Sequence, residues 1–113
     1  MAKPQITNDS AYQLLRAQRI SDFNTQKASL DLSKLRGCDF RGLDLRNLDA
    51  DGLDLTDCYF RLTDLRGIDF RNTILEGASF AEARISGCYF PASLNSDEIR
   101  LSVQFGTRLR CGK

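Results

Sequence analysis

From Leu30 to Phe90, an apolar residue returns every five positions almost without a miss, a spacing that fits neither common backbone. A helix turns about 100° per residue, so a five-residue repeat moves around its surface instead of forming a stripe. In a strand, an odd spacing sends alternate members to opposite faces. The chain must therefore turn a corner once per repeat, and the sequence predicts a solenoid. The apolar series is Leu30, Leu35, Phe40, Leu45, Ala50, Leu55, Phe60, Leu65, Phe70, Leu75, Phe80, Ile85 and Phe90.

Each five-residue unit divides into two inward positions, two outward positions and a corner. The residue two before the apolar centre is small or apolar, as at Cys38 and Cys58, and the alternation of an extended chain turns it inward. The outward residues beside the centre are often Asp and Arg. Gly, Asn and Asp, which tolerate positive φ, gather at the last position. We expect corners at Gly37, Gly42, Gly52, Gly67, Gly77 and Gly87, and at Asn47, Asp57 and Asn72.

Columns of Phe and Leu are predicted to form the core of the solenoid. Phe and Leu both recur at twenty residues, which suits a four-sided coil. Phe70 and Phe90 make a ten-residue spacing nearly as good, so the spacing alone leaves the choice open. The predicted core residues are Phe40, Phe60, Phe80, Leu45, Leu65 and Leu55.

These units resemble the pentapeptide-repeat family, whose pattern is roughly small–Asp/Asn–Leu–x–x. The resemblance covers residues 28–92 and is clearest at 38–42, 63–67 and 68–72. It implies a β-solenoid, namely a right-handed quadrilateral β-helix of about three coils, capped here by short helices at both ends. Large residues at the small inward position depart from the family and predict a local distortion near residues 43–53. They are Leu43, Leu48, Leu53 and Ile68.

Residues 1–27 are predicted to form an N-terminal helical cap, because a solenoid exposes unpaired backbone at its open ends. Asn8 or Asp9 can cap a helix. The apolar residues that follow give this segment a packing face. We expect one helix or two short ones over about 9–26, lying across the first coil of a single domain.

Residues 93–113 are predicted to form a C-terminal helical cap and tail. Asn95 and Glu98 have the spacing of a capping box, in which each side chain bonds the other residue's backbone N–H. Gly106 suits the residue that ends the helix. Residues 107–111 then alternate like a strand. This segment resembles the C-terminal cap of bacterial pentapeptide-repeat proteins.

The charge and the hydropathy pattern favour a cytoplasmic protein. A formal net charge of +1 gives no overall attraction to nucleic acid or to an anionic membrane, so we expect direct binding to neither. Residues 1–5 lead into polar residues without the apolar region of a signal peptide, and no apolar run reaches membrane-spanning length. In a reducing cytosol, the four cysteines are predicted to be free thiols.

No residue pattern predicts a catalytic, cofactor-binding or metal site. The sequence has no His, the commonest general base and metal ligand. Its cysteines lack CxxC spacing, and a zinc site built from thiolates needs four converging ligands. An Arg two residues later predicts a solvated lattice of ion pairs, not catalytic carboxylates. This spacing occurs at Asp39, Asp44, Asp64 and Asp69.

A few outward residues depart from the Asp–Arg pattern and form the candidate interaction patch. Tyr59, Arg61 and Leu62 place an aromatic ring, a cation without its own Asp and an apolar side chain together. Tyr89 repeats the Cys-Tyr-Phe string and is included in the patch. Aromatic residues and Arg are enriched at binding surfaces. The alternative is an ordinary β-surface on which Arg61 reaches diagonally to Asp39.

These features favour a non-enzymatic structural or protein-interaction module with an unknown protein partner, as a monomer or an end-to-end homodimer. The family resemblance suggests an alternative, because some pentapeptide-repeat proteins resemble B-form DNA and modulate DNA gyrase. Those proteins are long, strongly acidic rods, whereas this chain has few coils and stacks Arg41 with Arg61. An enzyme with a site at an open end of the solenoid is a third hypothesis.

Overall fold

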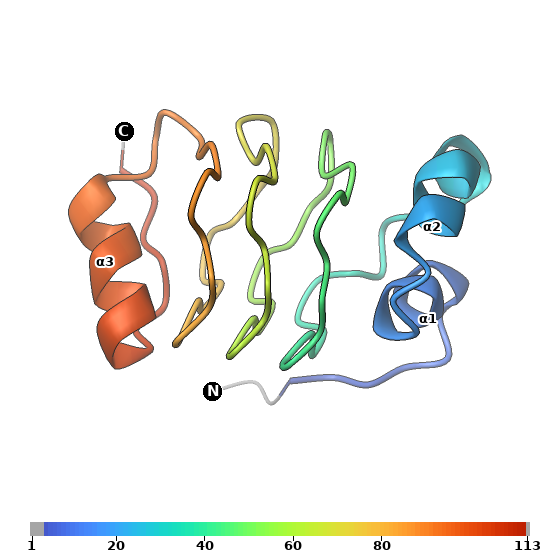
Figure 1. Ribbon diagram of the computed structural model, residues 1–113, viewed down its shortest axis with the longest axis horizontal. Helices are drawn as coiled ribbons and strands as arrows, with labels where there is room; N and C mark the ends of the chain where they lie inside the picture. Colours follow the sequence, from blue (N-terminus) through green and yellow to red (C-terminus); the bar gives the residue numbers. More distant parts are fainter. Residues whose placement is uncertain (1–3, 113) are drawn as a thin grey trace.

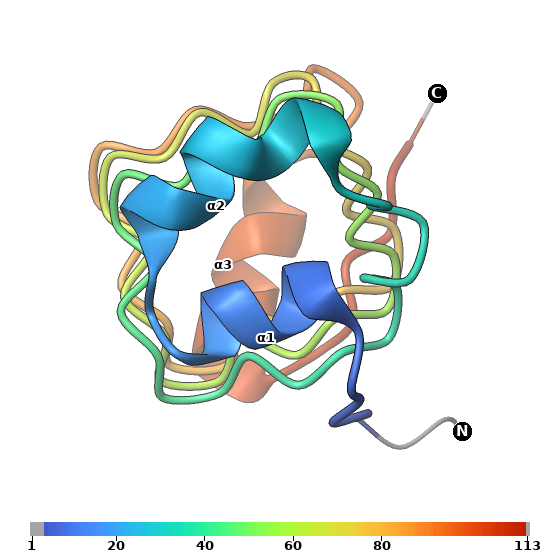
Figure 2. The ribbon, with the colours of Figure 1, turned by 90° about the vertical axis from the view of Figure 1, so that its right-hand side faces the viewer.

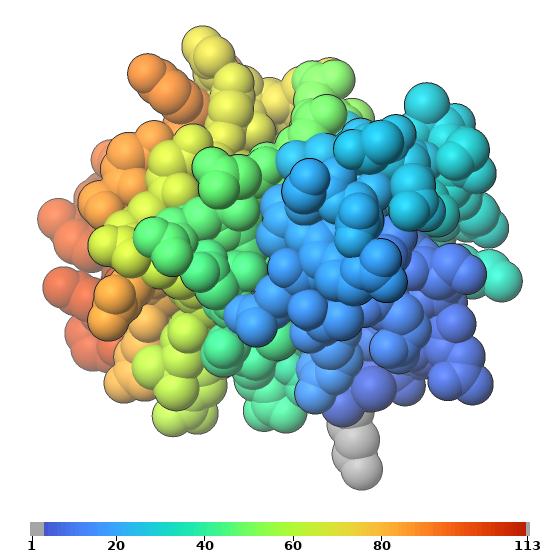
Figure 3. Space-filling model, turned by 45° about the vertical axis from the view of Figure 1, so that its right-hand side comes forward, coloured from blue at the N-terminus to red at the C-terminus, as the bar shows by residue number. Residues whose placement is uncertain are grey.

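The computed structural model describes residues 4–112 and shows a stack of coils between two sets of helices (Figure 1). At one end lie α1 (Ser10–Arg16), α2 (Ile20–Gln26) and a 3₁₀ turn, η1 (Lys27–Ser29). Helix α3 (Ser96–Phe105) lies at the other end. On the surface, the coils follow the N-terminal helices as successive bands (Figure 3).

Isolated parallel β-bridges join each coil to the next and define the coil length. They connect residues that are twenty positions apart, which agrees with a four-sided coil and not with the ten-residue spacing. Viewed along the stack, the coils superpose in a four-sided outline behind α1 and α2 (Figure 2). Each bridge pairs a single residue, so no longer strand forms within residues 4–112. The bridged pairs are Asp39–Tyr59, Asp44–Asp64, Asp54–Ile74, Tyr59–Ser79, Asp64–Arg84 and Asp69–Tyr89.

Each corner is a tight turn closed by a backbone hydrogen bond. The carbonyl of the apolar centre accepts from the N–H three residues later, as Leu65 does from Ile68 at 3.2 Å. The six predicted corner glycines have φ between 70° and 79°. This is the conformation that the third residue of a type II turn requires. Asn47 and Asp57 share it, with φ of 72° and 61°.

Three corners differ from the sequence prediction. Leu62 and Glu82 adopt left-handed φ values of 59° and 55°, although neither residue type favours them. Their place between two bridged sides therefore outweighs their own preference. Asn72 was expected to have positive φ but does not. Its side-chain amide instead donates to Asp51 Oδ1 at 3.0 Å.

Aromatic and aliphatic columns fill the interior of the coils. The rings of Phe40 and Phe60 stack with their centroids 5.4 Å apart and 9° between their planes. Phe60 and Phe80 also lie 5.4 Å apart, with their planes tilted. The remaining predicted core residues are 1 % exposed or less; they are Leu45, Leu55 and Leu65.

The inward pattern begins later than the five-residue spacing predicts. Ala28 and Ser33 occupy the small inward position of the first two units, but both are exposed, and Ala28 lies in η1. The first buried residues of the coils are Leu35 and Cys38. The earliest units therefore connect η1 to the packed coils.

The region with large inward residues lacks one bridge. Leu48 and Ala50 are both buried, so a large side chain at one inward position is followed by a small one at the next. Leu43 is only half-buried. Among residues 4–112, Asp49 and Asp69 are not bridged to each other, although the equivalent pairs one side earlier and one side later are. The predicted distortion near residues 43–53 thus coincides with an interrupted ladder.

The N-terminal segment supplies hydrogen-bond partners to the open edge of the first coil. Asp9 begins α1, and its carboxylate accepts from the Tyr12 N–H at 3.0 Å. The Tyr12 hydroxyl donates to the Asp39 carbonyl at 2.6 Å. Three backbone N–H groups of the first coil have acceptors in this segment: Asp39 donates to the Gln5 carbonyl, Asp44 to Gln18 Oε1 and Asp49 to Asn24 Oδ1.

Helix α3 and the tail cover the last coil. The Ser102 hydroxyl accepts from the buried Phe80 N–H at 2.8 Å. The tail pairs with residues 77–78 through Leu109, whose carbonyl accepts from Gly77 and whose N–H donates to Ala78, both at 2.8 Å. Arg108 forms an antiparallel bridge with Ser79. The tail therefore replaces the next coil along this edge.

The ends of α3 agree only partly with the predicted capping box. The Asn95 side chain accepts from the Asp97 N–H at 2.7 Å, and Gly106 ends the helix with φ of 71°. The Glu98 carboxylate does not return to Asn95. It accepts from Arg110 Nη2 at 2.7 Å and so fastens the tail to the helix. The Arg110 guanidinium gives this carboxylate two hydrogen bonds and a full opposite charge, whereas the Asn95 N–H could give it one hydrogen bond.

Candidate functional site

A groove beside the C-terminal end of α3 contains two of the four predicted patch residues, Tyr59 and Arg61. We call it the α3 groove. Its volume is about 610 Å³, and it lies between the outward side of the Phe columns and residues 103–106. Arg41, Ala81, Glu82, Val103 and Phe105 also line it. The groove therefore combines cations, one carboxylate and apolar side chains.

Phe105 was not predicted as a site residue from the sequence, yet its side chain is 72 % exposed. Leu101, one helical turn earlier, is also exposed. Two apolar side chains spaced by four residues mark a stripe on a helix. The sequence pattern that could have identified Phe105 is this stripe, together with its place next to Gly106, which ends the helix. Its direction, away from the coil, needed the three-dimensional structure.

Arg61 differs from the other Arg residues of the lattice in its ion pairing. Arg41 donates to both carboxylate oxygens of Asp39, with Nε–Oδ1 at 2.9 Å and Nη2–Oδ2 at 2.8 Å. Tyr59 stands at the Asp position before Arg61. Within the described chain, the only ion pair of Arg61 is with Glu82, at 3.9 Å. Contrary to the alternative interpretation, Arg61 does not reach Asp39, because Arg41 already binds that carboxylate.

Tyr59 has a structural role that its position in the repeat did not indicate. The guanidinium of Arg108 lies 5.2 Å from the centre of the Tyr59 ring, and its Nη2 donates to the Tyr59 hydroxyl. Arg108 also pairs with Asp57 at 3.1 Å. One arginine of the tail thus binds the corner residue Asp57 and the outward residue Tyr59 that follows it on the next side. Tyr59 forms the wall between the groove and the tail.

Leu62 follows Arg61 in the chain, at a corner outside the groove lining, and combines exposure with an unfavourable backbone conformation. Its side chain is 59 % exposed and its φ is 59°. A left-handed conformation costs an ordinary residue on the order of 1–2 kcal/mol. Leu62 gains little burial in return, so stability alone does not account for leucine here.

Replacement of Leu62 by asparagine is expected to leave the free energy of unfolding unchanged or to raise it by up to about 1 kcal/mol, because Asn tolerates positive φ. Urea unfolding measures this. The reciprocal control is Asn47→Leu, at an exposed corner with φ of 72°, which should lower stability by about 1 kcal/mol. A clear loss of stability in Leu62→Asn would show that the leucine side chain packs in the fold.

Tyr89 lies apart from the other patch residues. It is bridged to Asp69, half a coil away from the Tyr59 column, and therefore on another side of the solenoid. The guanidinium of Arg71 lies 4.6 Å from the centre of the Tyr89 ring. Tyr89 is exposed but has no place in the α3 groove. The patch predicted from sequence is thus two separate surfaces.

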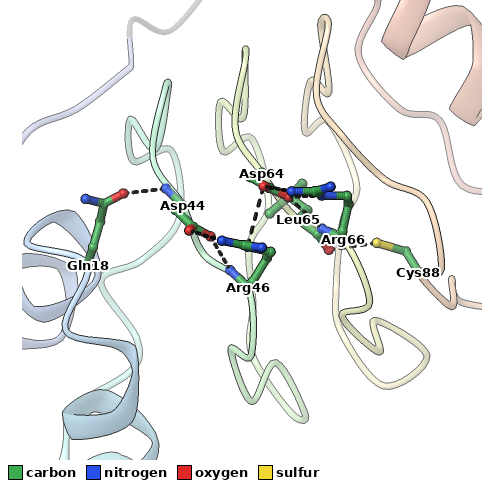
Figure 4. A network of polar contacts seen from close by, with 7 residues as sticks. All are labelled: Gln18, Asp44, Arg46, Asp64, Leu65, Arg66 and Cys88. Carbon is green, nitrogen blue, oxygen red and sulfur yellow. Dashed lines mark hydrogen bonds and ion pairs between the residues drawn. The ribbon is translucent and has the colours of Figure 1, made fainter.

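The Asp–Arg lattice joins two coils in a network around Arg46 (Figure 4). Arg46 Nη2 pairs with Asp44 at 2.8 Å, and its Nε lies 3.5 Å from Asp64 on the next coil. Arg66 Nη2 completes the network with a 2.7 Å pair to Asp64. Hydrogen bonding from Arg66 lowers the pKa of Asp64 from 3.8 to about 2. These charges neutralise one another, as the sequence predicted.

The stability of the fold is expected to fall in acid between about pH 4 and pH 2. The folded pKa of Asp64 is below its unfolded value of about 3.9, so its contribution is complete above that value and is lost as the pH falls through about 2. Carboxyl NMR titration should show the pKa of Asp64 rising toward 3.8 in Arg66→Gln. The control, Arg71→Gln, should raise the pKa of Asp69 and leave that of Asp64 low. An unchanged Asp64 titration in Arg66→Gln would contradict the assigned cause.

Comparison with known families identifies the chain. The family model described as pentapeptide repeats (8 copies) matches residues 26–61 and 54–90. The chain belongs to the pentapeptide-repeat family. No curated protein and no solved structure matches it. Pentapeptide repeats generally form a β-helix, and the twenty-residue register of the bridges agrees with that fold.

The thiols of this pentapeptide-repeat protein are poorly suited to nucleophilic chemistry. All four cysteines are free. Burial raises the pKa of Cys38 to about 11 and that of Cys58 to about 12. Burial also raises the pKa values of Cys88 and Cys111. Because the thiolate is the reactive form, these side chains act as core groups and as hydrogen-bond donors, as Cys58 does to the Leu35 carbonyl at 3.0 Å.

Residues 4–112 of the pentapeptide-repeat protein contain no group of three or more acidic or Cys side chains placed to hold a metal ion. Within the same range, no helix has the length and apolar character that a membrane span requires. The arrangement of side chains in the α3 groove is suited to binding through charge and apolar contact.

Proposed function

We propose that this pentapeptide-repeat protein is a non-enzymatic interaction module that binds another protein through the α3 groove. The observation that supports it best is the pairing of Arg61. Its guanidinium lacks the close carboxylate that Arg41 has, and it lines the groove together with the exposed side chain of Phe105. Exposed Arg and aromatic side chains that become buried on association account for much of the binding energy of protein interfaces.

The titratable groups support binding over catalysis. A general acid near neutral pH needs a raised carboxyl pKa, whereas ion pairing lowers the pKa values of Asp64 and Asp69 to about 2. The buried thiols are unsuited to act as nucleophiles, since their raised pKa values keep them protonated. The whole sequence has no His to act as a base.

The alternative, a DNA-mimic modulator of gyrase, is not favoured by the surface charges. A DNA mimic must present unbalanced negative charge, but Asp44 pairs with Arg46 and Asp64 with Arg66, so each carboxylate has its own cation. The formal net charge of the chain is +1. The interaction module is therefore the hypothesis that these observations favour.

The proposal also covers the handedness and coil number of the solenoid, its oligomeric state and its cellular compartment. We take the β-helix to be right-handed and quadrilateral, with about three coils and helical caps at both ends, as a monomer or an end-to-end homodimer. A bacterial cytoplasm suits four free thiols.

Site-directed photo-crosslinking in lysate of the source cells tests the proposed surface. A photoreactive residue replaces Ala81, in the groove, or Ala92, exposed on another side of the solenoid, as a matched control. We expect a discrete crosslinked protein from position 81 only, and its loss when Arg61→Glu is added. No crosslink, equal crosslinks from both positions, or a crosslink unaffected by Arg61→Glu would contradict the proposal.

A further inference from the structure

Building on the interaction surface proposed above, we infer the chemistry of its partner: a peptide segment that places a carboxylate on Arg61 and a neighbouring large apolar side chain against Phe105. The inference depends on the vacant acceptor position at Arg61, the apolar lining of the α3 groove and the groove's charge balance. The partner segment completes, from outside, the ion pair that other repeats form internally.

The Asp–Arg lattice defines what Arg61 lacks. In four units, an Arg donates through Nε and Nη2 to the carboxylate of the Asp two residues before it. This two-bond geometry is specific to a planar guanidinium and a carboxylate. At Arg61, Tyr59 replaces the Asp, and Glu82 stands 3.9 Å away, beyond hydrogen-bond distance. Among described residues, no acceptor forms a hydrogen bond with the Arg61 guanidinium. An incoming carboxylate therefore meets no competitor for these hydrogen bonds.

The apolar part of the groove lies close enough to take part in the same contact. Phe105 is 72 % exposed at the end of α3, and Ala81 and Val103 line the groove with it. Leu62, next to Arg61 in the chain, is exposed but does not line the groove. The groove volume of about 610 Å³ falls within the range of about 300–1,000 Å³ found for ligand sites. It suits one large side chain together with its acidic neighbour.

The charge balance favours a single carboxylate over a polyanion. Arg41 and Arg61 contribute two positive charges to the lining and Glu82 one negative charge, and Asp39, which pairs with Arg41 from outside the lining, supplies the second negative charge. The groove region therefore has no excess positive charge to attract a phosphate cluster or a nucleic acid backbone. A partner that carries one carboxylate gains the contact with the Arg61 guanidinium. A polyanion would add negative groups that Asp39 and Glu82 repel.

A fragment titration of the full chain tests this chemistry by amide NMR. The probes are 3-phenylpropionate, which joins a carboxylate to an aromatic ring, its neutral analogue 3-phenylpropionamide, and inorganic phosphate. They are added to about 20 mM, because fragments of this size bind weakly. We expect saturable shifts at Arg61, Ala81 and Phe105 with 3-phenylpropionate, and binding about tenfold weaker with the amide. Equal binding of the amide, or phosphate binding as tight at the same residues, would overturn the inference.

Variants assign the two contacts separately. Arg61→Gln should weaken 3-phenylpropionate binding about tenfold, and Phe105→Ala about fivefold. The matched control is Arg71→Gln, since Arg71 is bound by Asp69 and lies on another side of the solenoid. It should leave the affinity unchanged. Equal loss in Arg71→Gln, or none in Arg61→Gln, would overturn the assignment to Arg61.

The two experiments separate failure of this inference from failure of the proposed function. If crosslinking from position 81 depends on Arg61 but 3-phenylpropionate does not bind, the surface is correct and the partner chemistry is wrong. If 3-phenylpropionate binds as expected but crosslinking captures no protein, the groove chemistry stands and the proposed protein-binding function fails.

Discussion

Replacement of Phe60 by alanine is expected to lower the free energy of unfolding by about 3–5 kcal/mol. Phe60 is 1 % exposed and lies between Phe40 and Phe80, with ring centroids 5.4 Å away on both sides. Its removal takes away a buried aromatic side chain and leaves a cavity in the middle of the column. Coils that share this core and are held in register by bridges have little freedom to close such a cavity.

Urea unfolding followed by circular dichroism measures the effect of Phe60→Ala. The matched control is Phe105→Ala, which removes the same side chain from a site that is 72 % exposed and should change stability by about 0.5 kcal/mol or less. A loss below about 1 kcal/mol in Phe60→Ala would contradict the central position of this ring. The control also matters for the fragment titration, because it shows that Phe105→Ala keeps the fold.

The regular part of the fold could be predicted because one signal repeats along the chain. Each coil reuses the same geometry, so the inward direction of Phe60 is supported by Phe40 and Phe80 one coil away on either side. Corners show where position outweighs residue type. Leu62 and Glu82 take left-handed φ values because bridged sides flank them, whereas Asn72, which tolerates such values, does not need one.

The end caps were predictable as helices but not in their contacts. Gln18 and Asn24 satisfy the first coil's N–H groups through single side chains, and single polar residues leave no periodic signal. Glu98 shows the same limit at the other end. Its local sequence indicates a capping box, but Arg110, twelve residues later, reaches it in the folded chain.

Only part of the candidate site could be predicted for the same reason. Arg61 stood out because the repeat makes a missing Asp visible. Its neighbour Glu82 comes from the next coil and Phe105 from α3, so the groove exists only after the chain has folded. Tyr89 looked equivalent to Tyr59 because the two share the local string Cys-Tyr-Phe. Half a coil separates them, and the string does not record which side of the solenoid a unit occupies.

Replacement of Gly77 by valine is expected to lower the free energy of unfolding by about 2–3 kcal/mol, for two separate reasons. Gly77 has φ of 77°, which a β-branched residue resists. A Cβ atom at this position would also lie 2.0 Å from Asp57 Oδ1. Asp57 cannot move away without cost, because Arg108 of the tail holds that oxygen at 3.1 Å.

The control, Gly67→Val, isolates the backbone contribution to this loss. Gly67 has nearly the same φ, 79°, but nothing lies within 4 Å of an added Cβ, so only the conformational cost of about 1–2 kcal/mol applies. Urea unfolding should therefore give a lower free energy of unfolding for Gly77→Val than for Gly67→Val. The gap should shrink in an Arg108→Ala background, where Asp57 is free to turn. Equal midpoints for the two glycine variants would show that the Asp57–Arg108 contact yields at no cost, and an unchanged midpoint for Gly67→Val would mean that this corner does not require positive φ.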